Sequence, residues 1–324
     1  MLNTKNLSRK AVWVIVAIAL ILLFLLPVFA TSKYQIVTGT SIFLFAIFAT
    51  CVYQVAVVNR LLFGAGAFIS VGAYTSAILV MNFGFPFWPA MLLAGLASAL
   101  VAFVIGIPIL RIGGVYFAII TWCLGEVLIT IYKATPWFGG VDGIRGISPP
   151  SILGTPFVGP VPYYYLALGL MLVVIVVFYR LGKSRFGQDL KAIGLSDILA
   201  TSLGINVPRH RLMCFAISCF FIGLGGSFYA HYLSSIEPYF FGISLSSQVF
   251  AFTVIGGLGS LWGGLIGSTV MTVIPEWMHA VEQVRPLLYG AMIMFVIVVM
   301  PGGIVSLPRQ VRLWRKGKIR EAEG

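Results

Sequence analysis

Long apolar runs dominate the chain and are separated by short polar or glycine-rich stretches. A run of roughly 20 apolar residues is long enough to cross a bilayer as a helix. The sequence therefore indicates an all-α, polytopic integral membrane protein, in which residues 1–324 form a single transmembrane domain. We predict ten helices, near residues 11–30, 35–58, 61–81, 88–110, 113–132, 162–180, 212–232, 245–257, 261–275 and 287–307.

Eight spanning helices are the alternative to ten. The segments 245–257 and 261–275 are short and are interrupted by Gly256, Gly257 and Gly259. They could form one broken or re-entrant unit, which a membrane tolerates only where the backbone is buried in protein or lines a cavity. Either count is even, so the two termini lie on the same side.

The basic residues lie mainly on one side of these predicted spans. Alternating the spans from a cytoplasmic N-terminus places 17 of the 21 Lys and Arg residues inside, as the positive-inside rule requires. We therefore expect both termini to be cytoplasmic. The same alternation makes 134–161 a periplasmic loop, 181–211 a cytoplasmic loop and 308–324 a basic cytoplasmic tail that faces anionic lipid.

The composition excludes a soluble enzyme, a disordered chain and a disulfide scaffold. Hydrophobic residues make up 60% of the chain and charged residues 9%, whereas a soluble domain is about a quarter charged. The net charge of +12 fits loops that face lipid, so we expect no nucleic-acid partner. The four cysteines lie in apolar runs and the three histidines are scattered, so we expect no metal site.

Two glycine motifs resemble nucleotide-binding loops without their context. Gly182-Lys183-Ser184 ends like a phosphate-binding loop, but Val177 stands where its first glycine is needed. Gly257-Leu258-Gly259 begins like a dinucleotide fingerprint, but Trp262 replaces the third glycine. We expect no ATPase site, no cofactor and no enzymatic activity in this chain, so ATP-driven transport would need a partner subunit.

Small residues recur at spacings of four, which lets helix backbones approach closely. Close packing is the first interpretation of these faces, and helices that slide or gate a pathway are the alternative. The candidates for a pathway or a subunit interface are Gly66, Gly72, Gly256, Gly257 and Gly259.

Glu126 is the one acidic residue well inside an apolar span. A charge at the centre of a membrane helix costs about 2.5–3.5 kcal/mol on insertion scales. The carboxyl group could be buried and hydrogen-bonded to a neighbouring helix. Alternatively, Glu126 lines a pathway or an interface between subunits.

The outer loop brackets Asp142 and Arg145 with glycines. A turn held by an ion pair explains this pattern, and a platform for an external binding protein is the other interpretation. The inner loop mixes apolar and charged residues, which predicts short amphipathic helices with a glycine between them. Ser196 is expected to cap the second helix, with Asp197 in its first turn and Gly204 at its end. Such a loop suits a surface that receives a soluble partner.

Several motifs resemble the branched-chain amino acid permease family of the LivM type. They are Leu110 to Thr121 with Gly125-Glu126, Phe68 to Tyr74, Gly139 to Ile147, Ser184 to Asn206, Tyr229 to Leu233 and Val254 to Gly264. The inner loop resembles the coupling region of ABC importer permeases. Three features depart from the family pattern: Gly194 and Leu195 replace charged residues, Thr201 replaces a common Glu, and 59–62 differ from the usual run.

The resemblance implies a permease subunit in a bacterial or archaeal inner membrane. It implies a second related permease, two cytoplasmic ATPases that bind ATP and Mg²⁺, and a periplasmic or lipid-anchored binding protein. The cargo would be branched-chain amino acids, or urea or short amides. The residues that would dock the ATPase are Gly187, Asp189, Ala192, Ile193, Gly194, Asp197, Ala200 and Gly204. A secondary transporter coupled to protons or sodium, or a passive channel, is the alternative, but neither needs a receptor for an ATPase.

Overall fold

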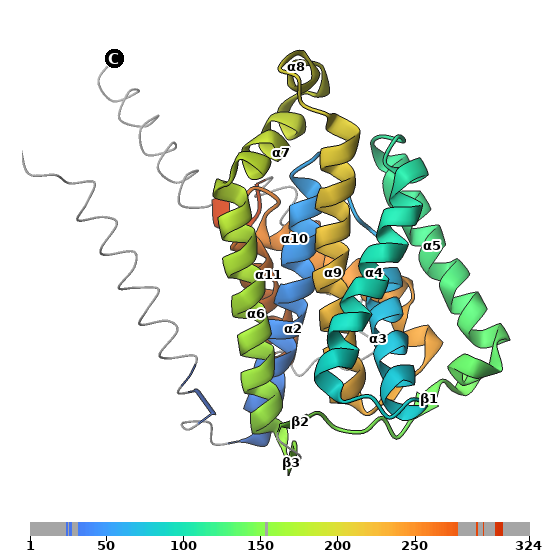
Figure 1. Cartoon of the computed structure of the whole chain (residues 1–324). Helices are drawn as coiled ribbons and strands as arrows, with labels where there is room; N and C mark the ends of the chain where they lie inside the picture. Colours follow the sequence, from blue (N-terminus) through green and yellow to red (C-terminus); the bar gives the residue numbers. More distant parts are fainter. Residues whose placement is uncertain are drawn as a thin grey trace, which may run out of the picture.

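Every apolar run predicted between residues 35 and 275 contains a helix in the computed structural model (Figure 1). The structure describes residues 32–152, 155–277 and 302–306, together with Phe24, Leu26, Pro27, Gly290 and Met294. The predicted spans 11–30 and 287–307 lie largely outside the described residues, and the tail 308–324 lies wholly outside them. The long helices are α2 (Lys33–Ala56), α3 (Ala65–Met81), α4 (Phe87–Ile109), α5 (Val115–Ala134), α6 (Pro160–Lys183), α9 (Val207–Leu233), α10 (Ile243–Gly256) and α11 (Gly263–Trp277).

Six of the described helical stretches are long and apolar enough to cross a membrane. They are residues 33–56, 87–109, 115–134, 160–183, 207–233 and 238–256. Helices α3 and α11 are apolar but shorter. The total of ten remains a prediction. The minor elements are α7 (Arg185–Leu195), α8 (Asp197–Ser202), η1 (Pro136–Phe138), η2 (Gly140–Asp142), η3 (Pro238–Phe241), η5 (Ile304–Ser306), β1 (Ile144–Arg145), β2 (Ser151–Ile152), β3 (Thr155–Pro156) and β4 (Ser235–Ile236).

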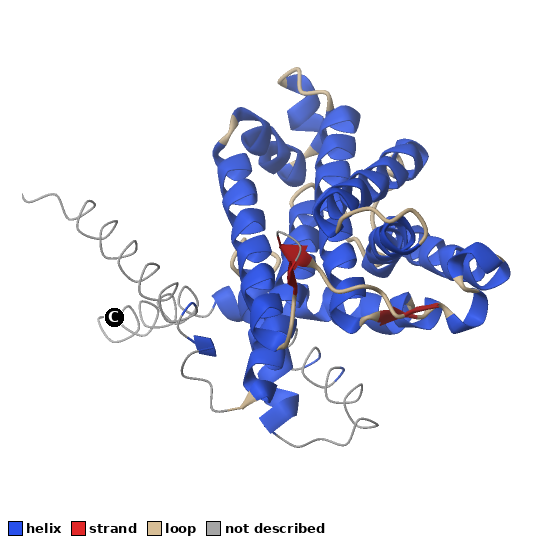
Figure 2. Ribbon diagram, turned by 60° about the horizontal axis from the view of Figure 1, so that its bottom comes forward, coloured by secondary structure: helices blue, strands red, loops and turns tan. Residues whose placement is uncertain are grey.

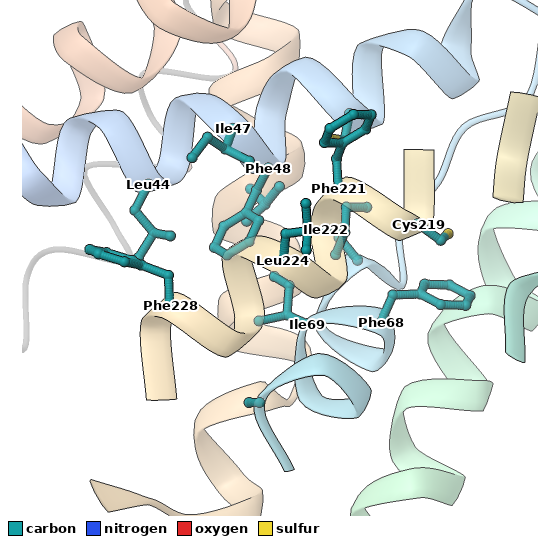
Figure 3. Close-up of a cluster of buried hydrophobic side chains, with 14 of the residues drawn as sticks. Leu44, Ile47, Phe48, Phe68, Ile69, Cys219, Phe221, Ile222, Leu224 and Phe228 are labelled. Atoms are coloured by element: carbon teal, nitrogen blue, oxygen red, sulfur yellow. The ribbon is translucent and has the colours of Figure 1, made fainter. Parts of the chain in front are cut away.

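Helix α9 forms the centre of the bundle and packs against α2, α3 and α4. Figure 3 shows how Phe48 of α2, Phe68 and Ile69 of α3, and Ile222 and Phe228 of α9 meet in one buried cluster. In a bilayer, such contacts gain their stability from close van der Waals packing, because lipid is as apolar as the core.

Glycines make the closest helix crossings possible. A Cβ atom on Gly72 would lie 2.2 Å from the carbonyl oxygen of Gly223, so α3 and α9 touch backbone to backbone. A Cβ atom on Gly66 would lie 2.3 Å from the carbonyl oxygen of Phe241. Any larger residue at these positions would force the backbones apart, which supports the packing interpretation for Gly66 and Gly72.

Gly256 and Gly257, at the end of α10, also allow close packing, whereas Gly259 does not. A Cβ atom on Gly256 would lie 1.8 Å from the carbonyl oxygen of Gly263. Gly257 is buried and has a φ of +117°, a conformation that favours glycine. Gly259 is exposed in the connection 257–262. The region 245–275 is thus two separate helices, α10 and α11, that pack against each other.

The bundle has two distinct ends (Figures 1 and 2). Helices α7 and α8 lie at one end, which we call the α7–α8 end. At the other end, β1 pairs antiparallel with β4 and aligns Ile144 with Ile236. This β1–β4 pair joins the predicted outer loop to the segment after α9, as the alternation of spans requires.

Candidate functional site at the α7–α8 end

Serine caps shape the two short helices of the predicted inner loop. The Ser184 hydroxyl accepts a hydrogen bond from the Gly187 amide at 3.2 Å and begins α7. The Ser196 hydroxyl accepts from the Leu199 amide at 3.4 Å and begins α8. Gly204, with a φ of +80°, follows the end of α8. The predicted cap and stop are confirmed.

The break between the two helices differs from the prediction of a glycine hinge. Ser196 separates α7 from α8, and Gly194 lies inside α7. A Cβ atom on Gly194 would lie 2.1 Å from the carbonyl oxygen of Val57, and one on Gly187 would lie 2.0 Å from that of Leu181. These glycines seat α7 against the ends of α2 and α6, which explains why glycine stands at both positions.

Three of the predicted docking residues face inward. Gly187, Ile193 and Ala200 are buried, and Ile193 and Ala200 pack in a small cluster with Val58 of the α2–α3 connection. In this conformation these three residues fix the two helices to the bundle. Their docking role stays a prediction. Asp197 and Gly204 are exposed, whereas Asp189, Ala192 and Gly194 are half-buried.

Four apolar side chains of this segment are exposed beside its polar ones. Leu195, Ile198, Leu199 and Leu203 have exposed fractions of 88%, 79%, 65% and 76%. They lie beyond the ends of α6 and α9 (Figure 1), outside the apolar bundle. A cluster of exposed apolar side chains marks a surface for another protein. We call these four residues the leucine patch.

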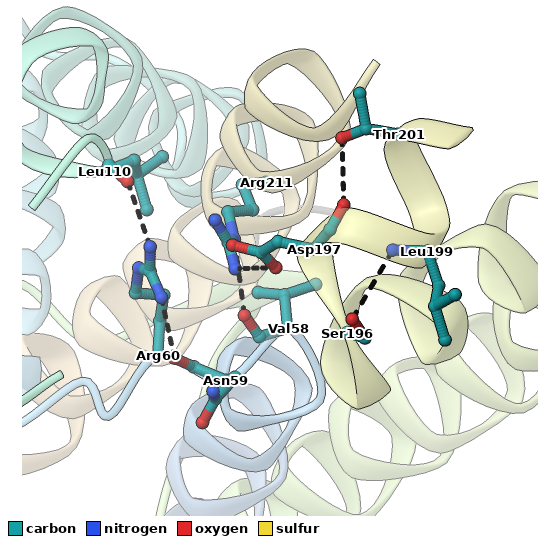
Figure 4. A network of polar contacts seen from close by, with 9 residues as sticks. All are labelled: Val58, Asn59, Arg60, Leu110, Ser196, Asp197, Leu199, Thr201 and Arg211. Atoms are coloured by element: carbon teal, nitrogen blue, oxygen red, sulfur yellow. Dashed lines mark hydrogen bonds and ion pairs between the residues drawn. The ribbon is translucent and has the colours of Figure 1, made fainter. Parts of the chain in front are cut away.

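One ion pair fastens α8 to the bundle (Figure 4). Arg211 of α9 donates to Asp197 Oδ1 at 2.6 Å and, through Nε, to the carbonyl oxygen of Val58 at 3.4 Å. The Arg211 side chain is only 7% exposed, whereas that of Asp197 is 50% exposed. A short, charge-assisted bond of this kind is stronger than a neutral one. It joins α8 to α9, and Arg211 links both to the α2–α3 connection.

A second buried arginine lies beside this pair. Arg60 donates to the carbonyl oxygens of Asn59 at 2.9 Å and Leu110 at 3.4 Å, which ties the α2–α3 connection to the end of α4. Burial and the charge of Arg211 lower the pKa of Arg60 from its ordinary value, and Asp197 opposes the shift. One carboxylate thus compensates two buried cations.

Asp189 holds α7 in a similar way. Its Oδ2 lies 3.3 Å from Nε2 of His210 on α9, and the His210 ring stacks on Phe186 with centroids 5.3 Å apart. Polar contacts therefore tie α7 and α8 to α9, and Arg211 of α9 in turn contacts the α2–α3 connection.

The β1–β4 end carries the other predicted polar pair. Arg145 lies 4.0 Å from Asp142 and 3.7 Å from Glu237, and the side chains of Arg145 and Asp142 are 68% and 90% exposed. The predicted ion pair is confirmed. A docking role for Asp142 and Arg145 stays a prediction.

Glu126 is exposed on α5, and no described residue donates a hydrogen bond to its carboxylate or forms an ion pair with it. The interpretation as a buried carboxyl bonded to a neighbouring helix of this chain is therefore wrong. Helix α5 lies at the edge of the bundle (Figure 1), and the exposed Glu126 has its carboxylate near Gly242, at the start of α10. A pathway or a subunit interface is the interpretation that remains.

Comparison with known proteins defines the family. The family model described as "Branched-chain amino acid transport system / permease component" matches residues 34–301. The chain belongs to this family. Family membership and the six apolar helices together make it a multi-pass membrane protein.

The similar members of the family are permease subunits. The chain is 29% identical over 290 residues to the high-affinity branched-chain amino acid permease protein LivM of Salmonella typhimurium, covering 82% of this chain and 68% of that one. It is 28% identical over 141 residues to LivH of the same organism, covering 43% and 45%. It is 24% identical over 271 residues to the autoinducer 2 permease protein LsrC of Escherichia coli, covering 80% and 75%. No solved structure matches the chain.

The sequence contained a signal for the leucine patch that its interpretation missed. Leu199 and Leu203 are spaced by four, which is the spacing of one helix face, and Leu195 lies before the Ser196 break. No sequence pattern predicted the contacts of Arg60 with Leu110 and of Arg211 with Val58, because the carbonyl partners lie in distant parts of the chain.

Proposed function

We propose that this chain is a permease subunit of an ABC importer. It would move branched-chain amino acids, or a related small polar solute, across the inner membrane of a bacterium or archaeon. Partner ATPases would bind ATP and Mg²⁺, and this chain would have neither an ATPase site nor a cofactor of its own. The observation that carries the proposal is the leucine patch, which is exposed on two short helices whose ion pairs tie them to α9.

The leucine patch is where an ATPase would dock. Its apolar centre is accompanied by exposed basic residues at 185, 191 and 209, and aromatic or aliphatic centres with polar rims are typical of protein interfaces. Closure of the ATPases would displace α8, and the Asp197–Arg211 pair would pass this displacement to α9 and α2.

The charge distribution supports a cytoplasmic location for this end. Among the described residues, three basic side chains lie at the β1–β4 end and eight at the α7–α8 end. The eight are Arg60, Arg111, Arg180, Lys183, Arg185, Lys191, Arg209 and Arg211. By the positive-inside rule, the α7–α8 end faces the cytoplasm, and both termini would then be cytoplasmic if the helix count is even.

The remaining partners follow from the relatives. Because the chain is similar to both LivM and LivH, a second related permease would complete the pathway. A periplasmic or lipid-anchored binding protein would deliver the cargo at the β1–β4 end, near Asp142 and Arg145. The similarity to LivM has the higher identity and supports an amino acid as the cargo over the autoinducer carried by LsrC.

The test is uptake by the purified complex in proteoliposomes. The chain is co-expressed with its second permease and ATPases, and leucine uptake is measured with ATP inside and saturating binding protein outside. Leu199→Arg should abolish ATPase co-purification and ATP-driven uptake, because a charge enters the centre of the leucine patch. The matched control is Ile112→Arg, which changes an exposed apolar residue at the same end but outside α7 and α8; it should keep both.

Two results would contradict the proposal. One is a Leu199→Arg complex that retains its ATPases and its uptake. The other is uptake by the unaltered protein that proceeds without ATP and collapses when the proton or sodium gradient is dissipated, which would identify a secondary transporter.

A further inference from the structure

Helices α4 and α5 follow each other in the chain and have exposed faces of different composition. All the exposed positions of α4 are apolar, among them Leu92, Leu96, Leu100 and Phe103, which is the composition of a face that contacts lipid. Helix α5 is different. Its exposed face combines apolar residues with the carboxylate of Glu126 near the middle of the span.

Glu126 is part of a polar strip and is not an isolated charge. Cys123, Glu126 and Thr130 are exposed at spacings of three and four, so they share one face of α5. A Cβ atom on Gly242 would lie 3.9 Å from Oε1 of Glu126. The carboxylate therefore lies beside the beginning of α10, where the helix dipole favours a negative charge.

Lipid cannot cover this strip at low cost. An ionised carboxylate at the middle of a membrane helix costs about 2.5–3.5 kcal/mol, and such residues face a water-filled cavity or a partner. Of the six candidate spans, α5 has the smallest share of its apolar window buried inside the chain, 28%. The rest of the α5 surface is thus available to line a cavity that another subunit completes.

We propose that the face of α5 carrying Cys123, Glu126 and Thr130 lines the translocation pathway, and that the Glu126 carboxylate binds the ammonium group of the transported amino acid. Exposed apolar neighbours, Ile119 and Val127, suit the aliphatic body of such a solute. The inference rests on the proposed function, because it requires a pathway completed by a second permease.

Chemical modification of Cys123 tests whether this face of α5 is in contact with water. Cys123 is the one exposed cysteine of this chain, and Cys51, Cys214 and Cys219 are buried. In the assembled complex, a charged, membrane-impermeant methanethiosulfonate should modify Cys123 and block leucine uptake. Nucleotide trapping with ATP and vanadate should change the modification rate at least threefold, because access to a pathway alternates. The reagent should not change the uptake rate of the Cys123→Ser complex, measured against the same variant without reagent.

Glu126→Gln tests the ammonium contact. Leucine uptake at saturating binding protein should fall at least tenfold, while subunit co-purification and ATP hydrolysis stay within twofold of the unaltered complex. Glu126→Asp should restore part of the uptake. Val104→Ala, on the exposed apolar face of α4, is the matched control for a structural change and should transport normally.

Three outcomes would overturn the inference while leaving the proposed function intact, since each assumes that the unaltered complex shows ATP-driven uptake. Modification of Cys123 only by a lipid-soluble maleimide would place the face against lipid. No modification by either reagent, with loss of the second permease from Glu126→Gln, would make the face a subunit contact. Normal leucine uptake by Glu126→Gln would exclude the ammonium contact. Absence of ATP-driven uptake in the unaltered complex would instead contradict the proposed function.

Discussion

The two ends of the bundle are held together by different kinds of contact. At the α7–α8 end, the buried guanidinium of Arg211 meets Asp197, and the buried Arg60 lies beside them. Removing one group there leaves a buried charge without its counter-charge, which is among the costly changes a folded protein can suffer.

Buried contacts at the β1–β4 end involve neutral groups. His231 of α9 is fully buried, its Nδ1 donates to the carbonyl oxygen of Ser148 at 2.7 Å, and its Nε2 accepts from the Ser76 hydroxyl at 2.9 Å. The carbonyl acceptor places the imidazole hydrogen on Nδ1. Ser227 in turn donates to the Ser76 oxygen at 2.7 Å. This neutral chain of hydrogen bonds fastens the outer loop to α9, while the charged groups of that end stay in solvent.

The difference matches what each end would do. A charged, buried link transmits a displacement because its partners separate only at high cost. A surface that receives a binding protein needs exposed charges on a fixed support. Three substitutions test this contrast, in decreasing order of expected effect.

The largest loss of stability is expected for Asp197→Asn. The side chain keeps its shape, but Arg211 and Arg60 lose their counter-charge. The free energy of unfolding should fall by about 2–3 kcal/mol, below the ~3–5 kcal/mol of a fully buried pair because Asp197 is half-exposed. Thermal unfolding of the purified permease complex in detergent measures the loss.

A double variant tests whether the loss of stability comes from the unpaired charge of Arg211 or from damage to α8. Adding Arg211→Met to Asp197→Asn removes one of the uncompensated charges and should recover at least half of the lost stability. ATP-driven uptake should stay low in the double variant, since the link is still missing. Full uptake in the double variant would show that the pair is only structural.

The sequence predicted the helices of this protein well because membrane spans obey simple rules. Apolar runs of about 20 residues, and Ser196 and Gly204 as cap and stop, rest on local chemistry that one sequence displays. The starts of α3 and α9 were less well placed, because α3 begins at Ala65 and α9 at Val207. Residues 61–64 are mostly apolar but not helical, whereas the first turn of α9 contains Arg209 and Arg211 and so lies outside the apolar run.

The site could be predicted only in part. The inner loop was identified by its amphipathic content, yet which of its residues face outward depends on how α7 and α8 sit on the ends of α2 and α6. Glu126 illustrates the same limit: its position within an apolar span was visible, but whether it faces the core or the outside depends on tertiary packing. Arg60 and Arg211 were counted for topology alone, because their contacts join residues about 50 to 150 positions apart.

An intermediate effect is expected for His231→Leu. The leucine leaves the Ser76 hydroxyl and the Ser148 carbonyl without their buried partner, which should cost about 1–3 kcal/mol of unfolding free energy. Ser227→Ala is the milder control, since it removes only the last donor of the chain. A loss clearly larger than that of Asp197→Asn would show that the two ends do not differ in the way proposed here.

The smallest effect on stability is expected for Arg145→Ala. Its contacts with Asp142 and Glu237 are 4.0 Å and 3.7 Å long and largely exposed, and such pairs contribute about 0–1 kcal/mol. Thermal unfolding should therefore be unchanged within about 0.5 kcal/mol, the range of most surface substitutions. The β1–β4 register should also persist, because its bonds are made by the backbone.

A docking role for the exposed charges is tested by Arg145→Glu. If they dock a binding protein, this variant should raise the half-saturating concentration of binding protein in the uptake assay several-fold. That concentration should also depend less on salt than in the unaltered complex, because rim charges act through long-range attraction. A stable Arg145→Glu complex with an unchanged half-saturating concentration would exclude Arg145 from the docking surface, and a destabilised Arg145→Ala complex would mean that this end, too, depends on its charges.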